Sequence, residues 1–175
     1  MVTPWLFPLV LIIILQRLAE LYIAHRNRML MLTEGAKEFG SRHYPLFFLL
    51  HIGWLVGLIV EASLWGAISP DWYLYFGFFV FSQGLRYWSI LSLGQFWNTR
   101  ILVIPGRKAI RKGPYCFFRH PNYIAVTVEL VSVPLIFGAG ITAAIATILN
   151  LWLLLGIRIP AEEKALALGI SEDND

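Results

Sequence analysis

The sequence is organised around residues 113–123, which read GPYCFFRHPNY. This stretch joins a Gly-Pro turn, several aromatic residues, an Arg-His pair and a proline that can begin a helix. It lies between a basic loop and a new apolar run. The stretch therefore predicts the mouth of a ligand site at a membrane surface.

The rest of the chain is too apolar for a soluble domain. Of its 175 residues, 58% are hydrophobic and only 14% are charged, whereas about 25% are charged in a typical soluble domain. The bilayer is therefore the expected solvent, and the length fits a single domain over residues 1–175. The single cysteine, Cys116, excludes an internal disulfide and a multi-cysteine metal site.

Membrane spans are predicted from apolar stretches, since a helix needs about 20 mostly apolar residues to cross the hydrocarbon. The stretches that qualify are residues 4–24, 44–62, 72–93, 121–138 and 141–159. The last two are separated by almost no loop, which predicts a tight antiparallel hairpin. We therefore expect an all-α integral membrane protein with about five transmembrane helices.

The basic residues predict an orientation. The two loops on one side, residues 25–43 and 94–120, hold ten Lys and Arg residues, whereas the loops on the other side hold none. Cytoplasmic loops carry the excess of Lys and Arg. We therefore expect the site and the C-terminus to face the cytoplasm, with the N-terminus outside.

The loop formed by residues 94–119 is long for a simple connection. Its segment 96–104 mixes aromatic, β-branched and basic residues. We expect this segment to lie half-buried in the headgroup region, and the alternative is a basic surface loop attracted to anionic lipid.

Several ionisable residues interrupt the apolar stretches, where such groups are costly and usually face one another or a cavity. Arg17 and Glu20 are three residues apart, so they share a helix face and are expected to pair. Glu129 lies deep in the fourth stretch, and a buried carboxylate needs a cation, a donor or a proton. Arg86 is a candidate partner, and a cationic ligand is the alternative. Arg86 and Asn150 either hold helices together or line a pocket.

A second polar cluster closes the fifth stretch, where RIPAEE occupies residues 158–163. Arg158 and Glu162 would share a helix face, although Pro160 between them favours a kink or a new helix start. The helix that begins at Pro121 presents free N–H groups that attract anions. Together with the aromatic residues, this set suits a ligand with a carboxylate, a flat base and a positive centre. S-adenosylmethionine is such a ligand.

Other kinds of site find little support in the sequence. The four histidines are scattered, and no His/Glu pair has metal-ligand spacing, so no metal is expected. There is no glycine-rich phosphate loop or dinucleotide fingerprint. Topology accounts for the basic loops, so membrane lipids are expected as neighbours and nucleic acid is not.

Taken together, these motifs resemble a known family. GPYxxxRHPxY at 113–123, Glu129 in the following helix and RxxxEE at 158–163 resemble the isoprenylcysteine carboxyl methyltransferase family of integral membrane enzymes. In the N-terminal half, QRLAEL at 16–21, RN at 26–27 and HYP at 43–45 resemble a bacterial branch of that family. The resemblance covers nearly the whole chain and is more specific in the C-terminal half.

The resemblance implies S-adenosylmethionine-dependent O-methylation of a lipid-tailed or prenylated substrate that enters from the bilayer. The acceptor is either an isoprenylcysteine-like carboxylate or the hydroxyl of a long-chain phenol or pyrone. Arg158 and Glu162 are expected to be catalytic, and about residues 94–175 to form the cofactor-binding part. The expected cofactor-binding residues are His120, Pro121, Tyr123, Tyr115, Arg119, Glu129, Glu163 and Lys108.

The chain departs from the family pattern in one place, where Ala125 or Val126 stands in the position of a usual glycine and implies a tighter cofactor pocket. Two other functions stay open. RHPNY also occurs in NADPH-dependent membrane sterol reductases, although their endings differ and this chain has no additional basic cluster for a 2′-phosphate. The other alternative is a non-catalytic membrane protein that binds lipid.

Overall fold

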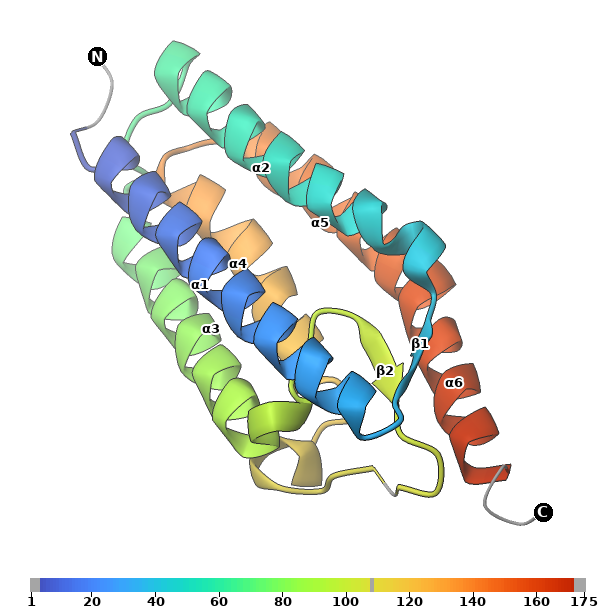
Figure 1. Cartoon of the computed structure of the whole chain (residues 1–175). Helices are drawn as coiled ribbons and strands as arrows, with labels where there is room; N and C mark the ends of the chain where they lie inside the picture. The colour runs from blue at the N-terminus through green and yellow to red at the C-terminus, as the bar shows by residue number, and fades with distance from the viewer. Residues whose placement is uncertain (1–3, 108, 172–175) are drawn as a thin grey trace.

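The computed structural model describes residues 4–107 and 109–171, and it is built almost entirely from helices (Figure 1). The long helices are α1 (Leu6–Thr33), α2 (Tyr44–Leu64), α3 (Trp72–Leu93), α4 (Pro121–Ile136) and α5 (Gly140–Leu153). Helix α5 continues through a π turn (Leu154–Arg158) into α6 (Ile159–Ser171). Short 3-10 turns occupy Ser41–His43, Gly94–Phe96 and Gly113–Cys116.

Each of the five apolar stretches forms a helix. Among the described residues, three helical stretches have the length and apolar composition of a membrane span: Leu6–Thr33, Ser41–Leu64 and Gly140–Leu168. Helix α4 is a shorter apolar helix. Large apolar side chains such as Leu15, Leu49 and Ile148 are exposed on these helices, as expected for surfaces that meet lipid. The chain is therefore a helical integral membrane protein.

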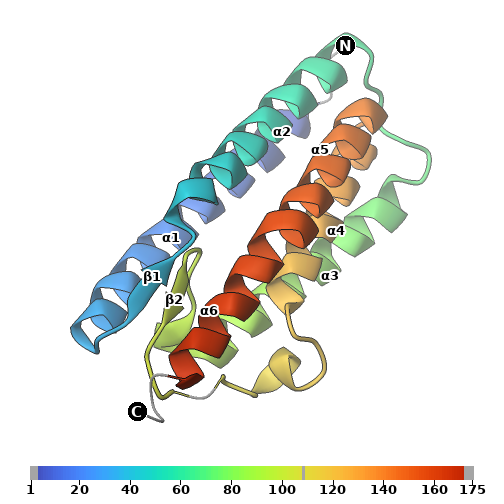
Figure 2. The same cartoon turned by 90° about the vertical axis from the view of Figure 1, so that its right-hand side faces the viewer.

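The helices form a bundle in which α4 packs between α3 and α5, and α2 packs against α5 (Figures 1 and 2). Residues 137–139 join α4 and α5 in the tight hairpin that the sequence predicts. Gly138 permits this turn because its φ of 67° lies in the left-handed region. The first turn of α1 and this hairpin lie at one end of the bundle, whereas α6 lies at the other (Figure 1).

Polar groups tie the helices together inside the apolar core. Trp54 of α2 is buried and donates its indole N–H to the carbonyl of Leu130 in α4 at 3.2 Å. Asn150 of α5 is fully buried and donates to Oγ1 of Thr127 in α4 at 3.0 Å. The sequence left open whether Asn150 holds helices together or lines a pocket. In the structure it holds α5 to α4.

A charged cluster of two arginines and two glutamates crosses the interior of the bundle. Arg17 Nη1 lies 2.5 Å from Glu20 Oε2, and Arg17 Nη2 lies 2.5 Å from Glu129 Oε2. Arg86 contacts both carboxylates, with 3.2 Å between its Nη1 and Glu20 Oε2. The predicted Arg17–Glu20 pair and the predicted Arg86–Glu129 contact are both confirmed. The four charges balance, so the cluster joins α1, α3 and α4 without leaving an uncompensated charge in the interior.

One short sheet accompanies the helices, which the all-α prediction did not include. Strand β1 (Lys37–Phe39) pairs antiparallel with β2 (Ile101–Val103). Ile101 and Val103 are buried against Ala165 of α6. The segment expected to lie half-buried at the membrane surface is thus partly a strand beneath α6, as alternating β-branched residues favour.

Candidate active site

A polar pocket lies where residues 93–103 meet the N-terminal ends of α4 and α6. Its volume is about 130 Å³. The polar side chains that line it are Asn98, Arg100, Tyr115, Arg119, His120, Asn122, Tyr123, Arg158 and Glu162. Residues from the opening stretch and from the RIPAEE cluster, far apart in the sequence, therefore face one another.

Tyr123 links the two residues predicted to be catalytic. Arg158 donates from Nε to the Tyr123 hydroxyl at 3.0 Å, and that hydroxyl donates to Glu162 Oε2. Arg158 is buried, and its Nη2 donates to the carbonyl of Thr99 at 2.9 Å. A guanidinium fixed by two acceptors presents a defined plane to an anionic ligand.

Local structure places these side chains. Pro121 is the first residue of α4 and is buried, so Tyr123 lies in the first turn of that helix. The π turn Leu154–Arg158 ends two residues before Pro160, and Glu162 lies in the first turn of α6. Pro160 has no N–H to donate, so the break expected there takes the form of a π turn. Such turns are frequent at functional sites.

Two further ring side chains complete the pocket. His120 stacks on Tyr123, with ring centroids 5.1 Å apart and planes inclined by 11°. Its Nδ1 lies 3.9 Å from Glu162 Oε1, so a protonated ring would pair with that carboxylate. Burial raises the pKa of Tyr115 to about 12, so its hydroxyl is protonated at neutral pH.

The other predicted cofactor residues lie at the rim or elsewhere. Glu163 is exposed, and its Oε1 is 3.7 Å from Nη1 of Arg119. Glu129 lies apart from the pocket, in the charged cluster of α1, α3 and α4. Lys108 lies outside the described residues. Within the part of the chain that the structure describes, no group of three His, Cys, Asp or Glu residues is arranged to hold a metal.

Some residues of the site were missed by sequence reasoning. Thr99 contributes its carbonyl to Arg158, and a backbone acceptor has no sequence signature. Arg100 lies 2.5 Å from Glu38, from its Nη1 to Oε1, and 4.3 Å above the ring of Tyr44. These contacts depend on the β1–β2 pairing, and the β-branched run around Ile101 was the available signal.

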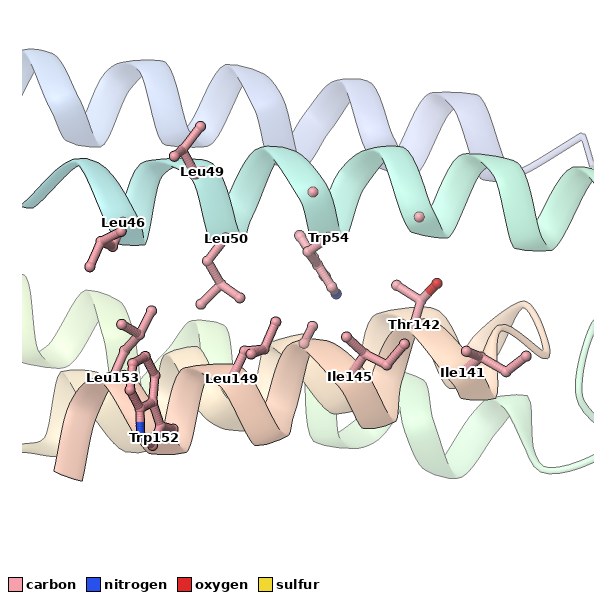
Figure 3. Close-up of a pocket in the computed structure, with 13 residues that line it drawn as sticks. Leu46, Leu49, Leu50, Trp54, Ile141, Thr142, Ile145, Leu149, Trp152 and Leu153 are labelled. Carbon is pink, nitrogen blue, oxygen red and sulfur yellow. The ribbon is translucent and has the colours of Figure 1, made fainter. Parts of the chain in front are cut away.

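An apolar groove of about 580 Å³ lies between α2 and α5 (Figure 3). It is lined by Leu46, Leu49, Leu50, Gly53, Trp54, Gly57, Ile141, Thr142, Ile145, Ala146, Leu149, Trp152 and Leu153. A Cβ at Gly53 would meet no heavy atom of the described residues within 4 Å, apart from its chain neighbours and its own helix backbone. Leu153 precedes Arg158 by five residues, about 7.5 Å along a helix. The groove therefore leads toward the polar pocket.

The fold, the polar pocket and the apolar groove define a helical membrane protein with a charged site near one end of that groove. A family model, that of the isoprenylcysteine carboxyl methyltransferase (ICMT) family, matches residues 74–168. The chain belongs to this family of membrane methyltransferases. Every residue that lines the polar pocket lies inside the matched segment.

Two bacterial relatives extend the similarity to the N-terminal helices. The chain is 42% identical over 163 residues to the uncharacterized protein YpbQ of Bacillus subtilis, covering 93% of this chain and 95% of that protein. It is 26% identical over 153 residues to an uncharacterized protein of Haemophilus influenzae, covering 86% and 88% respectively. No solved structure matches the chain.

Proposed function

We propose that this protein is an S-adenosylmethionine-dependent O-methyltransferase that acts on a lipid-tailed acceptor. The observation that carries the proposal is the Tyr123 bridge between Arg158 and Glu162, close to one end of the apolar groove. The arginine and the glutamate, held close together, suit the polar head group of a lipid-like acceptor. The apolar groove suits its hydrocarbon tail. Membership of a methyltransferase family supports the same reaction.

The chemistry of the pocket fits the cofactor. Arg119 would hold its carboxylate, the rings of His120 and Tyr115 would contact its base, and Glu162 would lie near its positive sulfur. The volume of about 130 Å³ is below the roughly 300 Å³ of small ligand pockets. Cofactor binding would therefore require the pocket to widen.

We further propose five spans, with the N-terminus outside and the pocket facing the cytoplasm. The distribution of Lys and Arg supports this orientation, and the first turn of α1 lies at the opposite end of the bundle from α6 (Figure 1). Cys116 is exposed and is the single cysteine of the chain. A membrane-impermeant maleimide should label it only after cells are opened, and labelling of intact cells would reverse the orientation.

The chain's own residues divide the work of methyl transfer. Bound S-adenosylmethionine would supply a methyl group on a positively charged sulfur. The acceptor oxygen would form its bond to that carbon as the carbon–sulfur bond breaks in line. Arg158 would orient an acceptor carboxylate, which has no proton to lose. A phenol or pyrone hydroxyl would give its proton to Glu162, with His120 beside it.

The groove between α2 and α5 would hold the acceptor's tail (Figure 3). Its lining is apolar, its volume is that of a typical ligand pocket, and α5 continues directly to Arg158. A tail that enters sideways from the bilayer would then bring its head to the pocket. The same geometry serves an isoprenylcysteine-like carboxylate and a long-chain phenol or pyrone.

Purified protein, radiolabelled S-adenosylmethionine and a panel of prenylcysteine, alkylphenol and alkylpyrone acceptors test the proposal. Arg158→Ala should abolish methyl transfer while the protein remains folded in detergent, and full activity in that variant would refute the assigned role. Thermal shifts offer an independent test, because a ligand stabilises the state that it binds. Stabilisation by S-adenosylhomocysteine is expected, whereas stabilisation by NADPH alone would point to a reductase. If neither ligand raises the melting temperature, the result would point to a non-catalytic protein.

A further inference from the structure

Asn27 is a fully buried polar residue in α1, outside the matched segment 74–168. Its amide nitrogen donates to the carbonyl oxygens of Gly94 at 3.1 Å and Trp97 at 2.8 Å. Its Oδ1 has no hydrogen-bond partner among the described residues. The side chain thus serves as a double donor toward the segment that leads from α3 to β2.

Helix α1 reaches this segment because it is longer than a membrane span. Its 28 residues rise about 42 Å, whereas the hydrocarbon core is about 30 Å thick. The last turns of α1 therefore extend past the hydrocarbon. Asn98 adds a hydrogen bond in the opposite direction, since its amide donates to the carbonyl of Ala24 at 2.9 Å.

The next residue in the chain is Thr99, whose carbonyl accepts the hydrogen bond from Arg158. On its other side, the backbone N–H of Arg100 donates to Oδ1 of Asn98 at 3.0 Å. Thr99 therefore lies in a segment fixed to α1, and a shift of that segment would move the carbonyl that orients Arg158. We propose that Asn27 is a positioning residue for Arg158, which rests on the methyltransferase function proposed above.

Packing alone does not account for this amide. Leucine has the same branched side-chain skeleton but would place no unpaired oxygen in the interior, and an unpaired buried oxygen costs free energy. The two N–H donors instead fix both ends of the 3-10 turn Gly94–Phe96. They set the direction in which the chain leaves α3 and approaches the pocket.

Hydrogen exchange and kinetics of the full-length protein test the proposal. In Asn27→Leu we expect amide exchange in residues 94–100 to rise about tenfold and kcat to fall about tenfold, because two carbonyls lose their donor. The KM for the acceptor should change little, since the groove is untouched. Asn150→Leu is the matched control, because it removes another fully buried amide and should leave exchange in residues 94–100 unchanged.

Unchanged exchange and kcat in Asn27→Leu would overturn the proposal, as would an equal effect of Asn150→Leu. If Asn27→Leu does not fold, Asn27→Ser takes its place, and Asn27→Gln should protect residues 94–100 better because it keeps both N–H donors. Exchange does not depend on methyl transfer. If the wild type were inactive and exchange were still faster in the variant, the proposed function would be refuted. The role of Asn27 in fixing residues 94–100 would be supported.

Discussion

Replacing Gly53 by phenylalanine tests the groove as the site of the acceptor's tail. A Cβ at this position points into open space among the described residues, so the ring would enter the groove between α2 and α5 (Figure 3). Gly53 lies seven residues after Leu46, about 10 Å along α2 from the end nearer the pocket. Tails that pass this point should be obstructed, and shorter tails should not.

The size of the effect follows from the solvent. A methylene that leaves water gains about 0.8 kcal/mol, but a tail that enters from the bilayer leaves other hydrocarbon. Steric exclusion is then the larger effect, and overfilling a packed apolar site costs about 1–3 kcal/mol. The KM for long-tailed acceptors should therefore rise about 5–150-fold, with little change for short ones.

The assay compares initial rates over a series of acceptors that differ only in tail length. Gly77→Phe is the control, because Gly77 is also open to a Cβ but lies on α3, away from the groove. An equal loss in both variants, or a loss in Gly53→Phe that is independent of tail length, would refute the reasoning. Quenching of Trp54 and Trp152 fluorescence by brominated tails would report occupancy without turnover.

Three further perturbations have defined outcomes. Tyr123→Phe leaves Arg158 without one acceptor and should lower kcat about tenfold to hundredfold, measured at saturating substrates; an unchanged kcat would contradict the bridging role. Arg86→Leu should destabilise the fold by about 3–5 kcal/mol, because Glu129 loses a buried partner; detergent unfolding curves would show it, and an unshifted transition would argue against the cluster. Burial alone would raise the pKa of Glu38, but hydrogen bonds and charge from neighbouring arginines outweigh it and lower that pKa. Wild type should therefore be more stable than Glu38→Gln above pH 4.5, the ordinary value, with the difference vanishing as pH falls through the folded pKa; a constant difference in pH-dependent unfolding would exclude this linkage.

Much of the bundle could be predicted from the sequence, because hydrocarbon-spanning helices and their connections leave long apolar runs. The charged cluster could also be predicted from the sequence, because a buried carboxylate such as Glu129 needs a partner and few cations lie at its depth. The gathering of Arg158, Glu162 and Tyr123 followed from placing two short motifs on one side of the membrane.

The supporting structure could not be predicted in the same way. Strands β1 and β2 have three residues each, too few for a clear alternation, and they pair across more than sixty positions. Thr99 acts through a backbone carbonyl, which every residue possesses. In the sequence, Asn27 is a polar residue near the end of a membrane helix. Its hydrogen bonds to the carbonyls of Gly94 and Trp97 become visible only in the folded structure.

The π turn has a consequence for how this enzyme family can vary. Helix α5 lines the groove, the π turn ends at Arg158, and Glu162 lies in the first turn of α6. An α-helix turns about 100° per residue, so adding or deleting one residue in the π turn would rotate α6 against α5. Substitutions in α5 or α6 do not change the number of residues in the turn, so they leave the rotation between the two helices unchanged. With the tail on α5 and the head at Arg158 and Glu162, as proposed above, substitutions would change tail preference and head chemistry independently. A change in the length of the turn would alter both.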